Sequence, residues 1–332
     1  MGAREFRCRN IGQKTKRRKV IINTGGRTDT VNYFSDWLLG RFREGYVLVR
    51  NPYYPKTVLR YELDPDVVDC VVFCSKNYAP ILSRLHEITD RFNTYFHYTI
   101  TAYGKDIEPG VPSIEESIET LRELSSMVGP DRIAWRYDPI MLWGDYTVER
   151  HLETFGRMAA ELHPYVSLCI FSFVEIYRKL EMNMPDLRPV SADNMQVIAK
   201  GLGEIAAKYG MRIQTCGHKE DFRRFGIQKS GCMTADILGR ANGTVFKKIP
   251  GKGVGSATRK GCGCMPTRDI GAYNTCLNGC RYCYANRDPE VALRNFKLHD
   301  PLSPMLLGHP EEGDTLKQAV QESFLTGEGF LF

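Results

Sequence analysis

Three cysteines near the carboxyl end of the chain have a spacing that suits iron chemistry. Cys276, Cys280 and Cys283 are separated by three residues and then by two, and Tyr282 stands directly before the last of them. An iron–sulfur cluster needs several thiolates close together in space, and a short loop with this spacing can supply them. Three thiolates account for three irons of a [4Fe–4S] cube, so the fourth iron would be open to a ligand from outside the protein.

The same cysteines allow two other interpretations. They could bind zinc together with a histidine or a fourth cysteine, or they could form disulfides. Nothing indicates secretion, because the start of the chain, MGAREFRCRN, lacks the apolar core of a signal peptide. No apolar run reaches the ~18 residues that a membrane span needs. We therefore expect a cytoplasmic protein with no membrane partner, whose eleven cysteines stay reduced and serve metal binding or catalysis.

The pattern Cys-x3-Cys-x-aromatic-Cys resembles the signature of the radical S-adenosylmethionine (SAM) enzymes. The resemblance implies that Cys276, Cys280 and Cys283 hold a catalytic [4Fe–4S] cluster whose open iron binds the amino and carboxylate groups of SAM. It also implies reductive cleavage of SAM to a 5′-deoxyadenosyl radical, with an electron donor such as flavodoxin or ferredoxin. Tyr282 matches the aromatic residue that lies near the adenine in those enzymes.

The position of the motif departs from that signature, because in those enzymes it usually follows the first strand of the barrel. The longer pattern CGC…DIGxYxTC…CxYCYA resembles an uncharacterised prokaryotic family with a C-terminal cysteine cluster of this kind. This second resemblance extends from Arg27 to Asn286 and implies a barrel fold, but it brings no established reaction.

Further cysteines form a second candidate metal site at a predicted strand end and in predicted loops: Cys216, Cys232, Cys262 and Cys264. Such a set suits a second [4Fe–4S] cluster or a tetrahedral structural zinc, and reduced thiols without a metal are the third interpretation. We favour a second cluster, which could relay an electron or present substrate. His218 is a spare ligand candidate close to Cys216. Cys70, Cys74 and Cys169 fall in predicted strands and are assigned to the core.

Apolar strands alternate with amphipathic helices through the first two thirds of the chain. The predicted strands are residues 19–24, 66–77, 94–103, 131–139, 165–176 and 211–216; the predicted helices are 31–44, one that begins at Pro80, 113–129, 147–162 and 191–210. Such alternation indicates parallel strands joined by crossover helices. No G-x-G-x-x-G follows a strand, so we expect an α/β fold with a complete or partial (β/α) barrel of the TIM or radical-SAM type.

The charge of the chain is unevenly distributed. Residues 1–19 hold eight Lys or Arg and one acid, a net charge of +7, so the whole-chain value of +6 leaves −1 for the rest. We divide the chain into a flexible basic arm (residues 1–18), a (β/α) barrel (19–216), and a cysteine-rich iron–sulfur segment with a tail that packs on the barrel (217–332). The arm could contact nucleic acid through phosphates, although a solvated terminus is the simpler interpretation.

Polar residues stand at the ends of the predicted strands, where the active site of a (β/α) barrel lies. The predicted catalytic residues are Asp29, Arg136, Asp138 and Glu175, and the predicted cofactor-binding residues are Arg27, Lys76, Thr101, Ser172 and Tyr282. The carboxylates could handle protons, or bind ribose hydroxyls or an amine. Arg136 and Lys76 could bind a carboxylate or a phosphate. The alternative is that these residues only cap helices or pair with one another.

The leading hypothesis is a radical-SAM-type enzyme that acts on a small molecule or a macromolecule of unknown identity. The rival hypothesis is a metal-stabilised protein that binds nucleic acid through its basic arm and holds zinc at its cysteines. A third hypothesis joins the two as a nucleic-acid repair enzyme.

Overall fold

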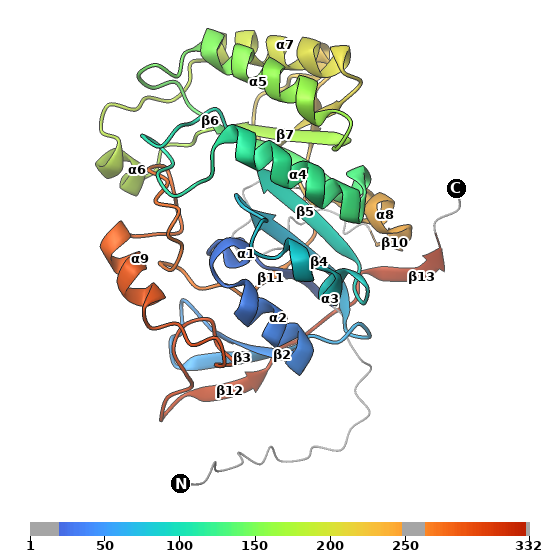
Figure 1. Cartoon of the computed structure of the whole chain (residues 1–332), viewed down its shortest axis with the longest axis vertical. Helices are drawn as coiled ribbons and strands as arrows, with labels where there is room; N and C mark the ends of the chain where they lie inside the picture. The colour runs from blue at the N-terminus through green and yellow to red at the C-terminus, as the bar shows by residue number, and fades with distance from the viewer. Residues whose placement is uncertain (1–19, 248–262, 330–332) are drawn as a thin grey trace.

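The computed structural model describes residues 20–247 and 263–329. The predicted basic arm (residues 1–18) and Cys262 lie outside these ranges. Within them the chain has a mixed α/β fold, built on one parallel sheet of eight strands (Figure 1). In their order across the sheet these strands are β11 (Arg268–Asp269), β1 (Val20–Asn23), β4 (Val68–Ser75), β5 (Thr94–Thr99), β6 (Ile133–Ile140), β7 (Leu168–Phe173), β8 (Arg212–Cys216) and β9 (Gln228–Ser230).

The strand order rises from β1 to β9 without a reversal. A doubly wound sheet reverses its order at a switch point, so this winding is the kind expected of a (β/α) barrel. The two short strands β9 and β11 form the edges, and no ladder joins them within the described residues, so the sheet is open. Both edge strands come from the segment after residue 216.

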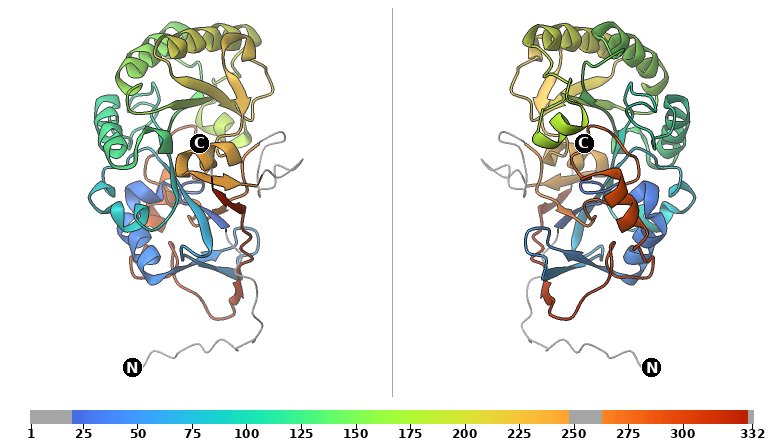
Figure 2. Two further views of the ribbon diagram at one scale, coloured as in Figure 1. Left: turned by 90° about the vertical axis from the view of Figure 1, so that its right-hand side faces the viewer. Right: turned by 90° about the vertical axis from the view of Figure 1, so that its left-hand side faces the viewer.

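Four helices cover the outer face of the sheet: α2 (Ser35–Glu44), α4 (Ile114–Val128), α5 (Val148–Leu162) and α7 (Ala192–Lys208). Figure 2 shows them along one side of the strands. The predicted capping box is confirmed, because the Glu116 amide donates to Ser113 Oγ (3.1 Å) and the Ser113 amide donates to the Glu116 carboxylate (2.8 Å). The side chains of Thr147 and Ser191 likewise cap α5 and α7.

Two predicted helices are shorter than expected. The helix predicted for residues 31–44 is broken at Phe34, whose φ of −137° is not helical, into α1 (Thr30–Tyr33) and α2. Gly45 ends α2 as predicted, in the left-handed region with φ of +76°. The helix predicted from Pro80 is a 3-10 turn at Leu82–Arg84 followed by the single-turn α3 (His86–Thr89).

The inner face of the sheet is apolar in its amino-terminal half and polar at its carboxyl end. Helix α8 (Ala235–Asn242) covers the apolar half, where Leu238 packs on Val72 and Tyr95 together with neighbouring apolar residues. Strands β10 (Thr244–Phe246) and β13 (Leu325–Gly329) form an antiparallel pair beside α8. Helix α8 therefore leaves the polar end of the inner face uncovered, where a functional site could lie.

The segment after Asn286 adds regular structure, which the predicted surface tail did not include. In this segment, helix α9 (Pro289–Phe296) follows the cysteine loop. A further short helix, α6 (Arg178–Asn183), lies outside it and follows β7. Strand β12 (Thr315–Gln318) pairs in parallel with β3 (Thr57–Glu62), which pairs with β2 (Tyr46–Arg50) (Figure 1). The Arg50 guanidinium donates to both carboxylate oxygens of Asp314 (2.7 and 2.8 Å), which holds the tail in place.

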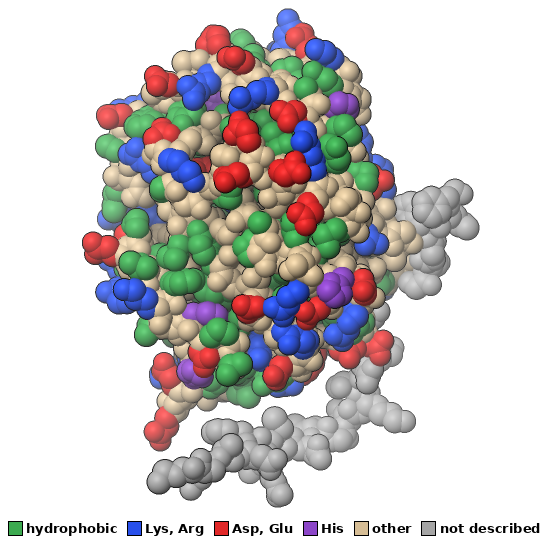
Figure 3. All heavy atoms as spheres, in the orientation of Figure 1, with side chains coloured by type: hydrophobic (Ala, Val, Ile, Leu, Met, Phe, Trp, Pro, Cys, Tyr) green, Lys and Arg blue, Asp and Glu red, His purple; other side chains and the backbone are tan. Residues whose placement is uncertain are grey.

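Acidic and basic side chains are interspersed on the face of the molecule drawn in Figure 3. This distribution agrees with the net charge of −1 calculated for the chain after residue 19. In the described ranges, every helix is too short or too polar to cross a bilayer.

His151 on α5 is buried under the loops that follow β5 and β6. Its Nε2–H donates to the Met141 carbonyl (2.9 Å), and its Nδ1 accepts from the Tyr137 hydroxyl (2.8 Å). Both ring nitrogens are thus satisfied in the neutral state. Burial lowers the pKa of His151 below the ordinary value of 6.5.

We expect this histidine to make the free energy of unfolding depend on pH. Its stabilising contribution is fully present above pH 6.5 and is lost as the pH falls towards the lowered pKa, because the unfolded chain binds the proton more tightly. The slope contributed is at most about 1.4 kcal/mol per pH unit. Urea denaturation at a series of pH values should show that the free energy of unfolding depends less steeply on pH in His151→Gln than in wild type. The variant His86→Gln, at an exposed position, should behave as wild type. Equal slopes in all three proteins would contradict this.

Candidate functional site

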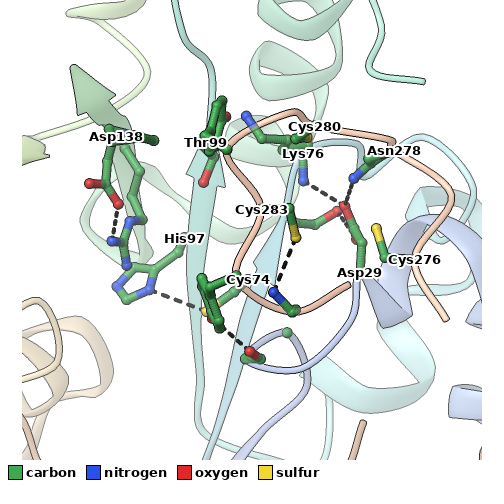
Figure 4. A pocket seen from close by; sticks show the side chains of 18 of the residues that line it. Asp29, Cys74, Lys76, His97, Thr99, Asp138, Cys276, Asn278, Cys280 and Cys283 are labelled. Carbon is green, nitrogen blue, oxygen red and sulfur yellow. Dashed lines mark hydrogen bonds and ion pairs between the residues drawn. The ribbon is translucent and has the colours of Figure 1, made fainter. Parts of the chain in front are cut away.

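A pocket of about 410 Å³ lies at the carboxyl ends of β1, β4, β5, β6 and β7. This volume is in the range of small-molecule sites. Residues 276–285 form one wall of it, so the cysteine loop faces the strand ends (Figure 4). The pocket brings together ten of the sixteen predicted site residues: Asp29, Lys76, Arg136, Asp138, Ser172, Glu175, Cys276, Cys280, Tyr282 and Cys283.

The pocket is polar because alternate residues of each strand point to the inner face. On β5 and β6 the inner-face residues are apolar first, at Tyr95 and Ala134, and polar next, at His97 and Arg136. The residues between them, such as Trp135, face the helices on the outer side. A two-residue period and a change from apolar to polar thus position the site.

Asn278 holds the cysteine loop against α1 and its capping residue, just after the first strand. Its side-chain amide donates to Asp29 (3.0 Å), and its side-chain oxygen accepts from Asn32 (3.1 Å) and from the Tyr33 hydroxyl (3.0 Å). The Gly110 amide donates to the Asn278 carbonyl (2.8 Å), and a Cβ at Gly110 would come within 2.6 Å of a loop carbonyl. The loop is therefore anchored by buried polar groups and by close backbone packing.

Asp29 is the central acceptor of this anchor. Its carboxylate accepts from the Ser75 hydroxyl (2.6 Å), the Lys76 amide (2.9 Å), the Asn32 amide (3.1 Å) and Asn278. Burial raises the pKa of Asp29, and these four donors oppose the rise. With its oxygens so engaged, Asp29 positions the cysteine loop.

The three thiols of the loop are close enough to influence one another. Burial, together with the charges of Asp29 and Cys283, raises the pKa of Cys276 to about 12. Burial also raises the pKa of Cys280, together with Glu108, while the Lys76 ammonium lowers it. Such thiols deprotonate when a metal binds them. The Ala285 amide donates to Cys283 Sγ (3.3 Å).

The spacing of these three thiols differs from that expected of the ligands of one metal ion. Among the described residues, the three sulfurs that all lie within 4.8 Å of one another are those of a different set, Cys216, Cys232 and Cys264. Thiolates on separate irons of a cube stand further apart than those that share one metal ion. Cys276, Cys280 and Cys283 would hold three irons, and the pocket in front of them leaves room for a further ligand.

Glu108 connects three predicted site residues, but the sequence analysis did not predict it as a site residue. It is 2% exposed, and its Oε1 accepts from Lys76 Nζ (2.9 Å), from the Thr101 hydroxyl (2.8 Å) and from the Tyr282 hydroxyl. Thr101, predicted to bind the cofactor, is not among the residues that line the pocket, and its hydroxyl bonds to this carboxylate. The available signal was an acid in the loop that follows a predicted strand, GKDIEPG.

Arg136 and Asp138 form an ion pair on the opposite side of the pocket, and Ser172 donates to Asp138. Glu175 is exposed and lines the pocket. Arg27 is not part of the pocket lining; it pairs with Asp269 (3.9 Å), and its guanidinium lies over the Tyr273 ring.

Cys74 packs against the apolar cluster of the inner face, in line with its assignment to the core, but it also takes part in the pocket. Cys74 is partly exposed and lines the pocket, and its Sγ lies 3.4 Å from His97 Nδ1 and 3.7 Å from Asn23 Oδ1. Burial raises the pKa of Cys74 to about 12, so its S–H donates to His97. Burial and the charge of Arg136 lower the pKa of His97 to about 3. Cys70, in contrast, is a fully buried core residue as predicted.

The second cysteine set is brought together in part. The sulfur atoms of Cys216, Cys232 and Cys264 all lie within 4.8 Å of one another, so this cysteine triad could bind a metal ion. Cys262 lies outside the described residues. His218 is not a member of the group; its ring packs against Phe173 and Phe222.

Comparison with known proteins gives little functional information. A family model described as a domain of unknown function (DUF1848) matches residues 21–285. No curated protein matches the chain. Among solved structures, a candidate alpha-L-fucosidase from Bacteroides thetaiotaomicron VPI-5482 is 15% identical, with a TM-score of 0.27. That match covers 50% of this chain and 50% of the other, and a likeness this weak supports no argument about function.

Proposed function

The chain belongs to the DUF1848 family of unknown function, and we propose that it is a radical-SAM-type iron–sulfur enzyme. In this proposal Cys276, Cys280 and Cys283 hold one [4Fe–4S] cluster at the pocket, on a sheet that forms a partial (β/α) barrel. The cluster would supply reductive cleavage of SAM to a 5′-deoxyadenosyl radical. An electron donor such as flavodoxin or ferredoxin would serve it.

The observation that supports this proposal most is the position of the motif. Three thiols from one anchored loop face the carboxyl ends of parallel strands across a pocket that a small molecule could fill. The cysteine loop can reach this pocket although it lies late in the chain, because the strand before it, β11, pairs in parallel with β1. A late motif thereby reaches the strand ends.

The other pocket residues suit SAM and a substrate. Tyr282 packs by its ring against Tyr103 and is held by Glu108, so it offers a fixed aromatic surface near the thiols. The guanidinium of Arg136 could bind a carboxylate, and Asp138 or Glu175 could bind an amine or ribose hydroxyls.

Anaerobic reconstitution tests the proposal directly. The reconstituted protein should carry about four irons at the 276–283 loop. After reduction, SAM should change its electron paramagnetic resonance spectrum, and 5′-deoxyadenosine should be released even without substrate. A full cluster with no spectral response and no cleavage under strong reductant would indicate a structural or electron-transfer cluster instead.

Arg136→Ala should keep the iron and weaken SAM binding. Loss of a charge-assisted hydrogen bond costs about 1.5–3 kcal/mol, which corresponds to roughly a 10- to 150-fold higher Kd. Asp138, left without its cation, would add repulsion towards the SAM carboxylate. Titration of the spectral change measures the affinity, with Arg157→Ala on the surface of α5 as the matched control. Equal affinities in the two variants would remove Arg136 from the SAM site.

The nucleic-acid hypothesis gains no support from the described residues. It depends on the basic arm, which lies outside them. The face drawn in Figure 3 mixes both signs of charge, whereas a nucleic-acid surface concentrates Lys and Arg.

A further inference from the structure

The cysteine triad Cys216, Cys232 and Cys264 lies where the two edges of the open sheet come together. Cys216 ends β8, Cys232 follows β9 by two residues, and Cys264 precedes β11 by four. Strands β9 and β11 are the two edges of the sheet, and no ladder joins them within the described residues. The triad therefore stands at the gap that a closed barrel would fill with hydrogen bonds.

The spacing of the sulfurs suits a single metal ion. Cys232 Sγ and Cys264 Sγ are 3.4 Å apart, and all three sulfurs lie within 4.8 Å of one another. Zinc–sulfur bonds of about 2.3 Å at tetrahedral angles place sulfurs about 3.8 Å apart. A disulfide would need about 2.05 Å, and the thiolates of a cube stand on separate irons. One thiophilic ion matches the observed spacing best.

Buried polar groups hold the two loops in this arrangement. The Cys232 amide donates to Cys264 Sγ (3.1 Å), the kind of outer hydrogen bond that supports a thiolate ligand. The Gln214 side chain donates to the Gly231 carbonyl (2.8 Å), and His97 Nε2–H donates to the Cys232 carbonyl (3.1 Å). These donors come from the inner face of β8 and β5. These hydrogen bonds hold the loops that carry Cys232 and Cys264 against the sheet.

The backbones of the two loops also touch. The Met265 amide donates to the Met233 carbonyl (2.7 Å). A Cβ at Gly231 would lie 2.6 Å from the Cys264 nitrogen and 3.0 Å from its sulfur, so only glycine permits this approach. Cys232 and Cys264 are 6% and 7% exposed, so water has little access to them.

We propose that Cys216, Cys232 and Cys264 bind one zinc ion, which joins β8 and the two edge strands and closes the gap in the sheet. Three thiolates and a divalent ion carry one net negative charge. The guanidinium of Arg136 on β6 interacts with Cys216 and Cys232 and offsets this charge from the pocket side. The site is independent of the 276–283 loop, and it does not rest on the proposed SAM chemistry.

Metal analysis of anaerobically purified full-length protein tests the inference. We expect about one zinc per chain, with zinc-edge X-ray absorption showing three or more sulfurs at about 2.3 Å. Cys232→Ser and Cys264→Ser should each lower the zinc content by about ten-fold or more. Cys169→Ala, a buried cysteine on the outer face of β7, should leave it unchanged. Removal of zinc by a chelator should lower the Tm of wild type and of Cys169→Ala.

A second variant separates this site from the proposed function. The triple change of Cys276, Cys280 and Cys283 to alanine should lose iron and retain zinc. Zinc that disappears with these three cysteines would overturn the inference. So would about eight irons per chain without zinc, since that composition means a second cluster. A metal-free protein with a Cys232–Cys264 disulfide in its mass spectrum would overturn it as well. The zinc-edge X-ray absorption spectrum of wild-type protein tests for zinc–sulfur ligation even where a serine variant fails to fold.

Discussion

Replacing Cys280 by alanine should abolish both iron binding at the 276–283 loop and the cleavage of SAM. Two remaining thiolates cannot hold a [4Fe–4S] cube, because three corners need a protein ligand when the fourth takes SAM. The charges of Lys76 and Glu108 also act on Cys280, so its loss changes the electrostatics around this ion pair. Iron content, the spectrum with SAM and release of 5′-deoxyadenosine measure the effect.

Cys74→Ala is the matched control for this experiment. Cys74 lines the same pocket, but it lies on β4 and outside the 276–283 loop. We expect the variant to load iron and cleave SAM. If Cys280→Ala retained its iron, or if Cys74→Ala lost as much, the three-cysteine site would be wrong.

Replacing Glu108 by alanine should lower the free energy of unfolding by about 3–5 kcal/mol, the cost of leaving one partner of a buried ion pair alone. The side chains of Lys76 and Glu108 are 12% and 3% exposed, so water cannot replace the lost carboxylate. The hydroxyls of Thr101 and Tyr282 lose their acceptor as well. Urea denaturation of the variant and wild type measures the difference.

Two comparisons identify the cause of that loss. Glu115→Ala, at an exposed position in the first turn of α4, should change stability little. Adding Lys76→Met to Glu108→Ala should restore part of the stability, because the double variant has no unpaired ammonium. If the double variant recovered no stability, the loss of stability in Glu108→Ala would come from lost packing and not from the unpaired charge of Lys76. Iron loading should also fall in Glu108→Ala, since Tyr282 within the cysteine loop loses its anchor.

The sequence by itself determined the elements that depend on near neighbours. The β-branched run VDCVVFCS is buried on both faces of a parallel strand, and its composition predicts this state. Ser113 and Glu116 lie three residues apart, so their capping box forms within one helical turn. The three-cysteine loop and most polar strand ends were also predictable, because a strand followed by a charged residue directs that residue to a common edge of the sheet.

Other features followed from contacts between residues far apart in the chain. Glu108 is a site residue only because Lys76 and Tyr282 meet it from other segments. Cys74 has a polar role because His97 stands beside it on the next strand. Strand β11 has two residues and no apolar pattern, so its pairing with β1 could not be predicted. The tail strand β12 is exposed throughout and forms because β3 offers it an edge.

The two cysteine sets show the same division. Cys276, Cys280 and Cys283 are close in sequence, and one loop suffices to place them on a pocket wall. The sulfurs of Cys216, Cys232 and Cys264 meet only after β8, β9 and the segment before β11 have packed on one sheet. Spacing along the chain determines what a single loop can bind. Long-range burial of apolar surface and pairing of distant strands decide which loops come together.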